Sequence, residues 1–159
     1  RLICFSITIL FLAIILEIFR RKYAKKEGLI LAIEAGLILS LNTVWASPGS
    51  TIVSHIVDGI IREEEIFFGI IIFIVILLIV AVGITIGQIS LKYGQANVLV
   101  PLTNVPIQIL PVIAFFIVFI SSPSNIFSIF YLMIGLILII SSSFLLSKRQ
   151  VTLEQIKKD

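Results

Sequence analysis

The sequence predicts an all-α membrane protein: a bundle of about five transmembrane helices in a single domain. Apolar residues make up 59% of the 159 residues and charged residues only 13%, against roughly 25% charged in a soluble domain. A soluble domain of this size would have to expose long runs of isoleucine and leucine on its surface. The apolar residues also fall in five stretches, each near the roughly 17–25 residues that a helix needs to cross a bilayer.

The five expected spans cover residues 2–19, 28–46, 66–91, 97–120 and 126–146. Length identifies them, because each is apolar nearly all round and shows little helical periodicity. Between the second and third spans we expect an outer loop over residues 47–65, which begins at Pro48-Gly49 and ends in Glu63–Glu65. After the fifth span, residues 147–159 are expected to form a cytoplasmic tail.

The lysines and arginines predict the orientation in the membrane. With five alternating spans, the basic residues of the 20–26 connection, Lys92 and those after residue 147 all fall on one side, and only Arg1 and Arg62 on the other. The positive-inside rule then places the C-terminus in the cytoplasm, and we expect a multi-pass protein of the plasma membrane. Because the basic residues cluster at helix ends, we expect the lipid bilayer as a partner and no nucleic acid.

The fourth span carries the most polar residues. Five of its residues follow at spacings of four, three, four and three, and so share one helix face: Asn97, Pro101, Asn104, Gln108 and Pro111. With Pro106, three prolines interrupt the span, and each removes a backbone donor. We expect these helix-breaking prolines to open a cavity in which Asn97, Asn104 and Gln108 bind a substrate. The alternative is a kinked helix whose amides bond to neighbouring helices.

In the third span, Gly83 and Gly87 form a small-xxx-small pair, which is typical of close helix packing in lipid. Gln88 follows directly, and an amide at this depth needs a partner. It can bond across to Asn104 or Gln108 or bind the substrate itself, and the sequence leaves both interpretations open.

Glu34 lies about two turns inside the second span. A carboxylate at that depth is costly unless it is paired, hydrated or protonated, so Glu34 is the candidate proton-coupling residue. Alternatively, the span begins later and leaves Glu34 at the headgroups beside Lys25 or Lys26.

The expected outer loop combines His55 and Asp58 with Glu63–Glu65. One histidine beside scattered carboxylates is not a metal-binding motif, so we expect a solvated acidic loop and no metal or cofactor. We do not expect an enzyme either, because the chain has no second histidine, no glycine-rich phosphate loop and no Ser/His/Asp set.

From Ile66 onward, about 80 residues resemble the second repeat of the EamA-like permeases in the drug/metabolite transporter (DMT) superfamily. The stretch from Ser90 to Pro101, S-L-K-Y-G-Q-A-N-V-L-V-P, is similar to the family pattern A-L-K-Y-x-x-A-S-L-V-x-P. Leu110-Pro111-Val112 and Gly135 resemble further family positions. The chain departs from the family where it has Ser121–Ser124 in place of a frequent glutamate.

Two other resemblances lie in the second span. Gly36–Ser40 is similar to the NIPA-type magnesium transporters of the same superfamily. Glu34 resembles the glutamate that small multidrug resistance proteins carry in their first helix.

The DMT resemblance implies two inverted repeats around a central cavity, of which this chain supplies one. Because the chain starts at Arg1 rather than Met, we expect either an N-terminal repeat in a longer protein or a homodimer. The implied function is transport of a small metabolite or drug-like solute by alternating access, with proton coupling at Glu34. The alternatives are a non-transporting scaffold or assembly subunit, and a divalent-cation (magnesium) transporter that uses Glu63–Glu65.

Overall fold

The computed structural model describes residues 1–23, 26–60, 62–119 and 126–156, and of residues 126 and 146–156 it describes the backbone alone. The described residues form five helices: α1 (Leu2–Lys22), α2 (Glu27–Val57), α3 (Glu63–Ser90), α4 (Ala96–Ile117) and α5 (Ile126–Ile156). Each helix is long and apolar enough to cross a membrane. The prediction of an all-α bundle is therefore confirmed, with the five candidate spans of a multi-pass membrane protein.

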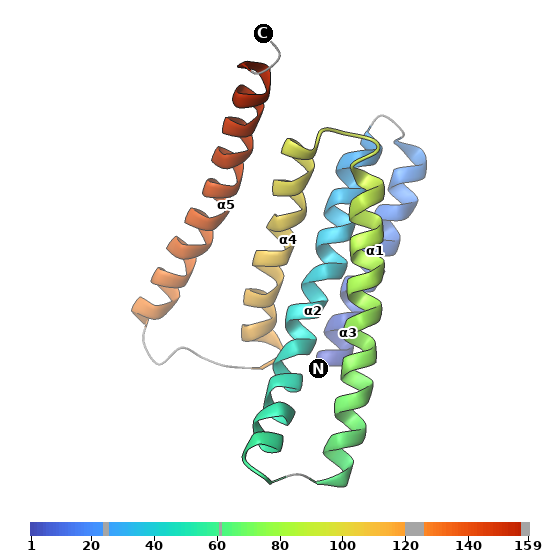
Figure 1. Ribbon diagram of the computed structural model, residues 1–159, viewed down its shortest axis with the longest axis vertical. Coiled ribbons are helices and arrows are strands. Elements are labelled where there is room, and N and C mark those ends of the chain that lie inside the picture. Colours follow the sequence, from blue (N-terminus) through green and yellow to red (C-terminus); the bar gives the residue numbers. More distant parts are fainter. Residues whose placement is uncertain (24–25, 61, 120–125, 157–159) are drawn as a thin grey trace.

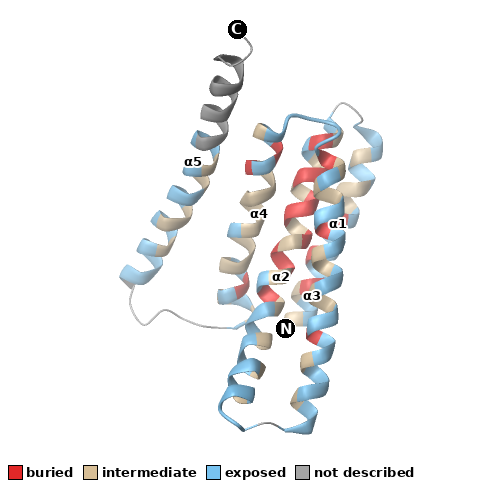
Figure 2. Ribbon diagram, in the orientation of Figure 1, coloured by how far each residue is buried: buried red, intermediate tan, exposed pale blue. Residues whose placement is uncertain are grey.

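The helices run alternately up and down, and α2 occupies the centre (Figure 1). Helices α1, α3 and α4 all pack on α2, whereas α5 packs on α4. Most of the buried positions in the described residues therefore belong to α2, while no residue of the apolar stretch Phe127–Leu145 in α5 is buried (Figure 2).

Small residues let the central helices approach closely. A Cβ atom placed on Gly36 of α2 would lie 2.3 Å from the backbone oxygen of Thr103 in α4. On the neighbouring face, a Cβ atom on Gly83 of α3 would lie 2.6 Å from Cγ of Leu39, and one on Gly87 would lie 3.8 Å from Cβ of Ala35. Because lipid supplies no hydrophobic drive between helices, such close van der Waals packing is what holds a membrane bundle together.

The predicted outer loop over 47–65 is wrong, because most of it is helical. Helix α2 continues through Pro48 to Val57, and α3 begins at Glu63. A proline inside a helix removes one backbone hydrogen bond, yet the helix continues, and Gly49 and Ile52 after it lie against α3. Glu63–Glu65 form the first turn of α3, where the helix dipole favours negative charge. Gly59, at φ +70°, closes the turn.

Other boundaries shift less. Helix α4 ends at Ile117 rather than at residue 120, and α5 continues as a helix to Ile156, through most of the expected tail. Residues 121–125 and 157–159 lie outside the described residues.

The connections between α1 and α2 and between α3 and α4 lie at the same end of the bundle as the C-terminal end of α5 (Figure 1). Arg20–Lys22 end α1, and Lys92 lies in the connection after α3. The described basic residues of both connections therefore gather at one end, as the charge pattern predicts.

Candidate functional site

One stripe of α2 faces α1 and carries the buried carboxyl group. Glu27, Glu34, Leu41 and Trp45 follow at spacings of seven, seven and four, so they share one helix face. Glu27 binds Arg20 of α1, and the Nε1 of Trp45 donates a hydrogen bond of 3.0 Å to the Ser6 hydroxyl of α1. Glu34 lies between these two contacts and therefore on the seam between α1 and α2.

Glu34 is buried within the bundle, with 7% of its surface exposed. Its Oε2 atom has no hydrogen-bond partner among the described residues. Glu17 and Arg20, both on α1, lie within electrostatic range of the carboxyl group. Helix α2 begins at Glu27, a full two turns before Glu34, so Glu34 lies well inside the helix.

A charged cluster closes the seam at its basic end. The Nε and Nη2 atoms of Arg20 donate to the two carboxylate oxygens of Glu17 at 2.7 and 2.6 Å, and its Nη1 donates to Glu27 at 2.6 Å. The side chains of Glu17, Arg20 and Glu27 are only 22–29% exposed. Arg21 lies 3.6 Å from Glu17 but is 79% exposed. Arg20 is thus the cation of the cluster that lies inside the seam and ties α1 to α2.

The prolines of α4 do not break it. Pro101, Pro106 and Pro111 all lie inside one continuous helix, so the predicted helix-breaking role is wrong for the described fold. Each proline lacks the N–H group that would donate one backbone hydrogen bond, and the remaining backbone hydrogen bonds keep α4 helical. Pro106 lies against Gly36, because its Cγ would be 3.1 Å from a Cβ atom there. Pro106 therefore takes part in packing against α2.

The amides predicted to bind substrate do not converge within the chain. Gln88 is exposed, and it lies five residues after Gly83, about 140° around α3 from the face that meets α2. Asn104 is partly exposed and Gln108 is exposed, each two residues from Pro106, which faces α2. Both therefore point away from the central helix. No hydrogen bond joins Gln88 to either amide in the described part of the chain.

Asn97 behaves differently. It lies in the first turn of α4, partly buried, and its Oδ1 atom is enclosed without a hydrogen-bond partner among the described residues. Glu34 Oε2 is the other such atom in the part of the chain that the structure describes, and neither belongs to the exposed amides. Buried polar atoms are normally satisfied, so these two mark places where a proton, water or ligand group fits.

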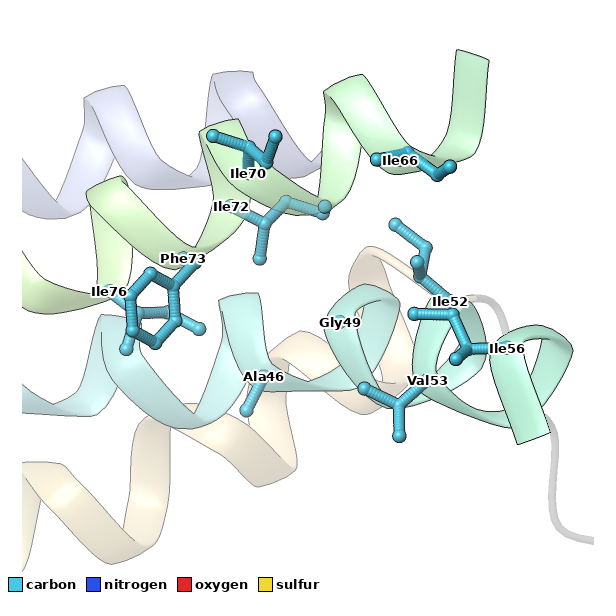
Figure 3. A pocket seen from close by; sticks show the side chains of 11 residues that line it. Ala46, Gly49, Ile52, Val53, Ile56, Ile66, Ile70, Ile72, Phe73 and Ile76 are labelled. Carbon is cyan, nitrogen blue, oxygen red and sulfur yellow. The ribbon is translucent and has the colours of Figure 1, made fainter. Parts of the chain in front are cut away.

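An apolar crevice lies between the C-terminal half of α2 and the first turns of α3 (Figure 3). This crevice of about 450 Å³ is lined by alanine, glycine, isoleucine, valine and phenylalanine alone. Three further cavities, of about 210, 280 and 570 Å³, lie beside Tyr93, beside Pro111 and between the first turns of α1 and the end of α4. None of the four is lined by Glu34 or by Gln88, Asn97, Asn104 or Gln108.

At the tip of the α2–α3 hairpin, His55 Nδ1 lies 3.1 Å from Glu65 Oε1. Glu63 and Glu64 are exposed beside it. Within the described ranges, no three His, Cys, Asp or Glu side chains stand close enough to hold a metal ion. The three glutamates therefore do not form the converging mouth that a divalent-cation path requires.

Sequence reasoning missed Glu27 as a partner of Arg20. It also missed the Trp45–Ser6 bond and the contact of Gly36 with Thr103. The seven-residue spacing between Glu27 and Glu34 was the available indication for Glu27. The other two contacts depend on which helices are neighbours, and no spacing within one helix shows that.

No known family model, curated protein or solved structure matches this chain. The resemblance to the DMT superfamily therefore stays a prediction.

Proposed function

We propose that this chain is half of a membrane transporter that moves a small metabolite or drug-like solute. One observation carries the proposal: Gln88, Asn104 and Gln108 lie on faces of α3 and α4 that point away from α2 and are left exposed or partly exposed by the chain itself. Amide side chains at membrane depth need hydrogen-bond partners or water. A single copy in lipid would leave these amides without either.

A second five-helix half would supply the hydrogen-bond partners or the water that these amides require. Placed against the exposed amide faces of α3 and α4, it would complete a polar cavity between the two halves, in the way inverted repeats enclose a solute site near the bilayer midplane. The second half is either a repeat encoded in the same longer protein or another copy of this chain. Alternating access then follows from rocking of one half against the other.

Glu34 supplies the proposed proton site. It is buried on the α1–α2 seam with one unpartnered oxygen, so it can bind one proton and release it without breaking a hydrogen bond at that atom. We place the protein in the plasma membrane with the basic end and the C-terminus in the cytoplasm, in accordance with the positive-inside rule.

A second candidate function is a non-transporting scaffold subunit. It is favoured by the four cavities, none of which reaches Glu34 or the amides. In that case the polar faces of α3 and α4 bond directly to a partner helix, and no water-filled space separates the two halves.

The test is solute uptake into proteoliposomes that contain the purified full-length protein. Amino acids, cationic drugs and magnesium are screened with and without an imposed proton gradient, for the wild type, Glu34→Gln and Gln108→Ala. We expect gradient-driven uptake of one solute class that falls at least about tenfold in Glu34→Gln, because glutamine cannot carry the proton. Gln108→Ala should weaken solute binding and raise KM.

A control is Ile14→Ala, which shortens an exposed apolar side chain on α1, outside the proposed amide faces of α3 and α4, and should leave uptake unchanged. Uptake that survives Glu34→Gln but not Gln108→Ala keeps the cavity and removes the proton role. If folded protein takes up none of the solutes, the scaffold function replaces the transporter.

A further inference from the structure

The apolar crevice between α2 and α3 runs lengthwise along the two helices. On α2 its lining extends from Ala46 to Ile56, about 15 Å along the helix axis. On α3 the lining extends from Ile66 to Ile76, so that the crevice opens toward the tip of the α2–α3 hairpin at Ile56 and Ile66 (Figure 3). Water occupies a cavity only where polar groups hold it. Since the lining is wholly apolar, hydrocarbon has to fill the crevice in a membrane.

The position of the crevice along α2 matches one leaflet of a bilayer. Helix α2 begins at Glu27, at the basic end of the bundle, and ends at Val57, about 45 Å further along its axis. A bilayer is about 40–45 Å thick with its headgroups, around a hydrocarbon core of about 30 Å. The hairpin tip therefore reaches the headgroups of the leaflet opposite the basic end. From there the crevice extends inward by about 15 Å, which is the depth of the acyl chains of one leaflet.

An arginine lies at the mouth of the crevice. Arg62 directly precedes α3, one turn before Ile66, which is the first crevice residue of that helix. The residue is exposed, and no ion pair within the described residues engages its guanidinium group. Guanidinium groups bind phosphate oxygens through paired, charge-assisted hydrogen bonds. A phosphate group at headgroup level therefore fits beside Arg62.

The other charges at the tip are mainly negative. Asp58, Glu63 and Glu64 are exposed, while Glu65 contacts His55 of α2 at 3.1 Å. Three exposed carboxylates near one guanidinium group repel a headgroup that carries a net negative charge. They attract a headgroup that carries an ammonium group beside its phosphate. The charges at the tip are therefore complementary to a zwitterionic headgroup.

We propose that the crevice binds one acyl chain of a zwitterionic phospholipid. Arg62 binds the phosphate of that lipid, and its ammonium group lies among the exposed carboxylates of the tip. The apolar walls accept any acyl chain, so the headgroup contacts select the lipid. The bound chain fills the space that the side chains of α2 and α3 leave between them. This site goes beyond the proposed transport function, because a transporter and a scaffold subunit would both contain it.

The experiment is photolabelling of the full-length protein in bilayers that contain equal amounts of phosphatidylethanolamine, which is zwitterionic, and phosphatidylglycerol, which is anionic. A trace of either lipid carries a diazirine in the middle of one acyl chain, and mass spectrometry locates the label. At Ile70 and Phe73, which line the crevice on α3, the phosphatidylethanolamine probe should label at least about fivefold more than the phosphatidylglycerol probe. At Ile14, an exposed apolar residue of α1, both probes should label equally.

Arg62→Gln tests the headgroup contact. Without the guanidinium group, labelling of the crevice by the phosphatidylethanolamine probe should fall to the level of the phosphatidylglycerol probe. Arg21→Gln is the matched control, because it removes an exposed arginine at the opposite end of the bundle, and the preference should stay as in the wild type.

Ala46→Phe tests the acyl-chain site, because the larger side chain fills the inner end of the crevice. Labelling at Ile70 and Phe73 should fall for both probes. The matched control is Ala81→Phe, which enlarges an exposed alanine of α3 outside the crevice lining and should leave the labelling unchanged. Circular dichroism and gel filtration show whether each variant is folded. If Ala46→Phe is not folded, Val53→Phe fills the same crevice nearer its mouth.

The proposal is overturned if the two probes label Ile70 and Phe73 equally in the wild type, or if Arg62→Gln has no more effect than Arg21→Gln. It is also overturned if a folded crevice-filling variant labels like Ala81→Phe. Each of these results would mean that the crevice contains unselected bilayer lipid. The labelling requires no transported solute, so its outcome is independent of the uptake experiment.

Discussion

Single atoms at the surface of α2 decide how near its neighbours come. The tightest position is Gly36, where a Cβ atom would lie 2.3 Å from a backbone oxygen of α4. Backbone cannot rotate out of the way as a side chain can, so even one methyl group forces the helices apart. At Gly83 the nearest atoms belong to the side chain of Leu39, which has other rotamers. The two glycines therefore differ in how much they tolerate.

We predict that Gly36→Ala destabilises the protein by roughly 1–3 kcal/mol, the usual cost of overpacking a filled interface. The measurement is the midpoint of thermal unfolding in detergent, followed by circular dichroism. Gly135→Ala is the control, because no atom lies within 4 Å of a Cβ atom there, and alanine is the better helix former. An equal loss in both variants would contradict the close α2–α4 approach.

Among the elements, the hairpin of α2 and α3 departs furthest from expectation. The residues after Pro48 were expected to form a loop, yet they remain helical, and two of them, Gly49 and Ile52, lie against α3. A Cβ atom on Gly69 would lie 3.3 Å from Cγ2 of Ile52. A loop over the same residues would not hold that pair in register.

We predict that cysteines at Ile52 and Gly69 form a disulfide on mild oxidation, in a Cys4→Ser background that removes the native thiol. The contact brings the two side chains near the roughly 3.5–4.5 Å Cβ separation that a disulfide needs. The control pairs Ile52→Cys with Ile71→Cys, because Ile71 is exposed and lies about 200° around α3 from Gly69. Mobility on a non-reducing gel after proteolysis between α2 and α3 reports the bond. Equal bridging of both pairs would indicate a loop rather than a packed helix.

For the whole molecule, the question is what covers the outer faces of α3 and α4. Helix α5 packs on α4 but leaves its own apolar stretch unburied, and Gln88 and Gln108 remain exposed. Helix α2 is therefore covered by its neighbours, whereas the outer faces of α3, α4 and α5 stay exposed. An open periphery with polar positions is what one half of a larger assembly presents to the other.

We predict that a cysteine at Gln108 reacts with a small, water-soluble maleimide in intact membranes, because the proposed cavity is filled with water. A cysteine at Ile14 of α1, which is exposed on an apolar position outside the proposed cavity, should react at least about tenfold more slowly, because the thiolate that reacts does not form in lipid. The readout is the mass increase of each protein over time. Slow reaction at both positions would mean that the face packs solidly, and the scaffold function would then hold.

The sequence alone determined the helical class, the number of spans and the end at which the described basic residues gather. Composition and stretch length carry that information, because a chain in lipid has to satisfy its backbone within each span. Glu34 was also found from sequence, since a carboxylate amid apolar residues is visible in any apolar stretch. The rule that proline ends or breaks a helix gave wrong predictions at Pro48 and at the prolines of α4. At each of these positions the helix continues despite one missing backbone hydrogen bond.

Only the tertiary structure decided which helix is central and which faces meet. It placed Arg20 between Glu17 and Glu27 and turned Gln88 and Gln108 outward. Helices that are apolar nearly all round offer many nearly equivalent packing faces, so their own periodicity does not select one. The selection comes from shape, where glycines such as Gly36 and Gly83 allow a close approach, and from the few charges that have to find each other across a seam.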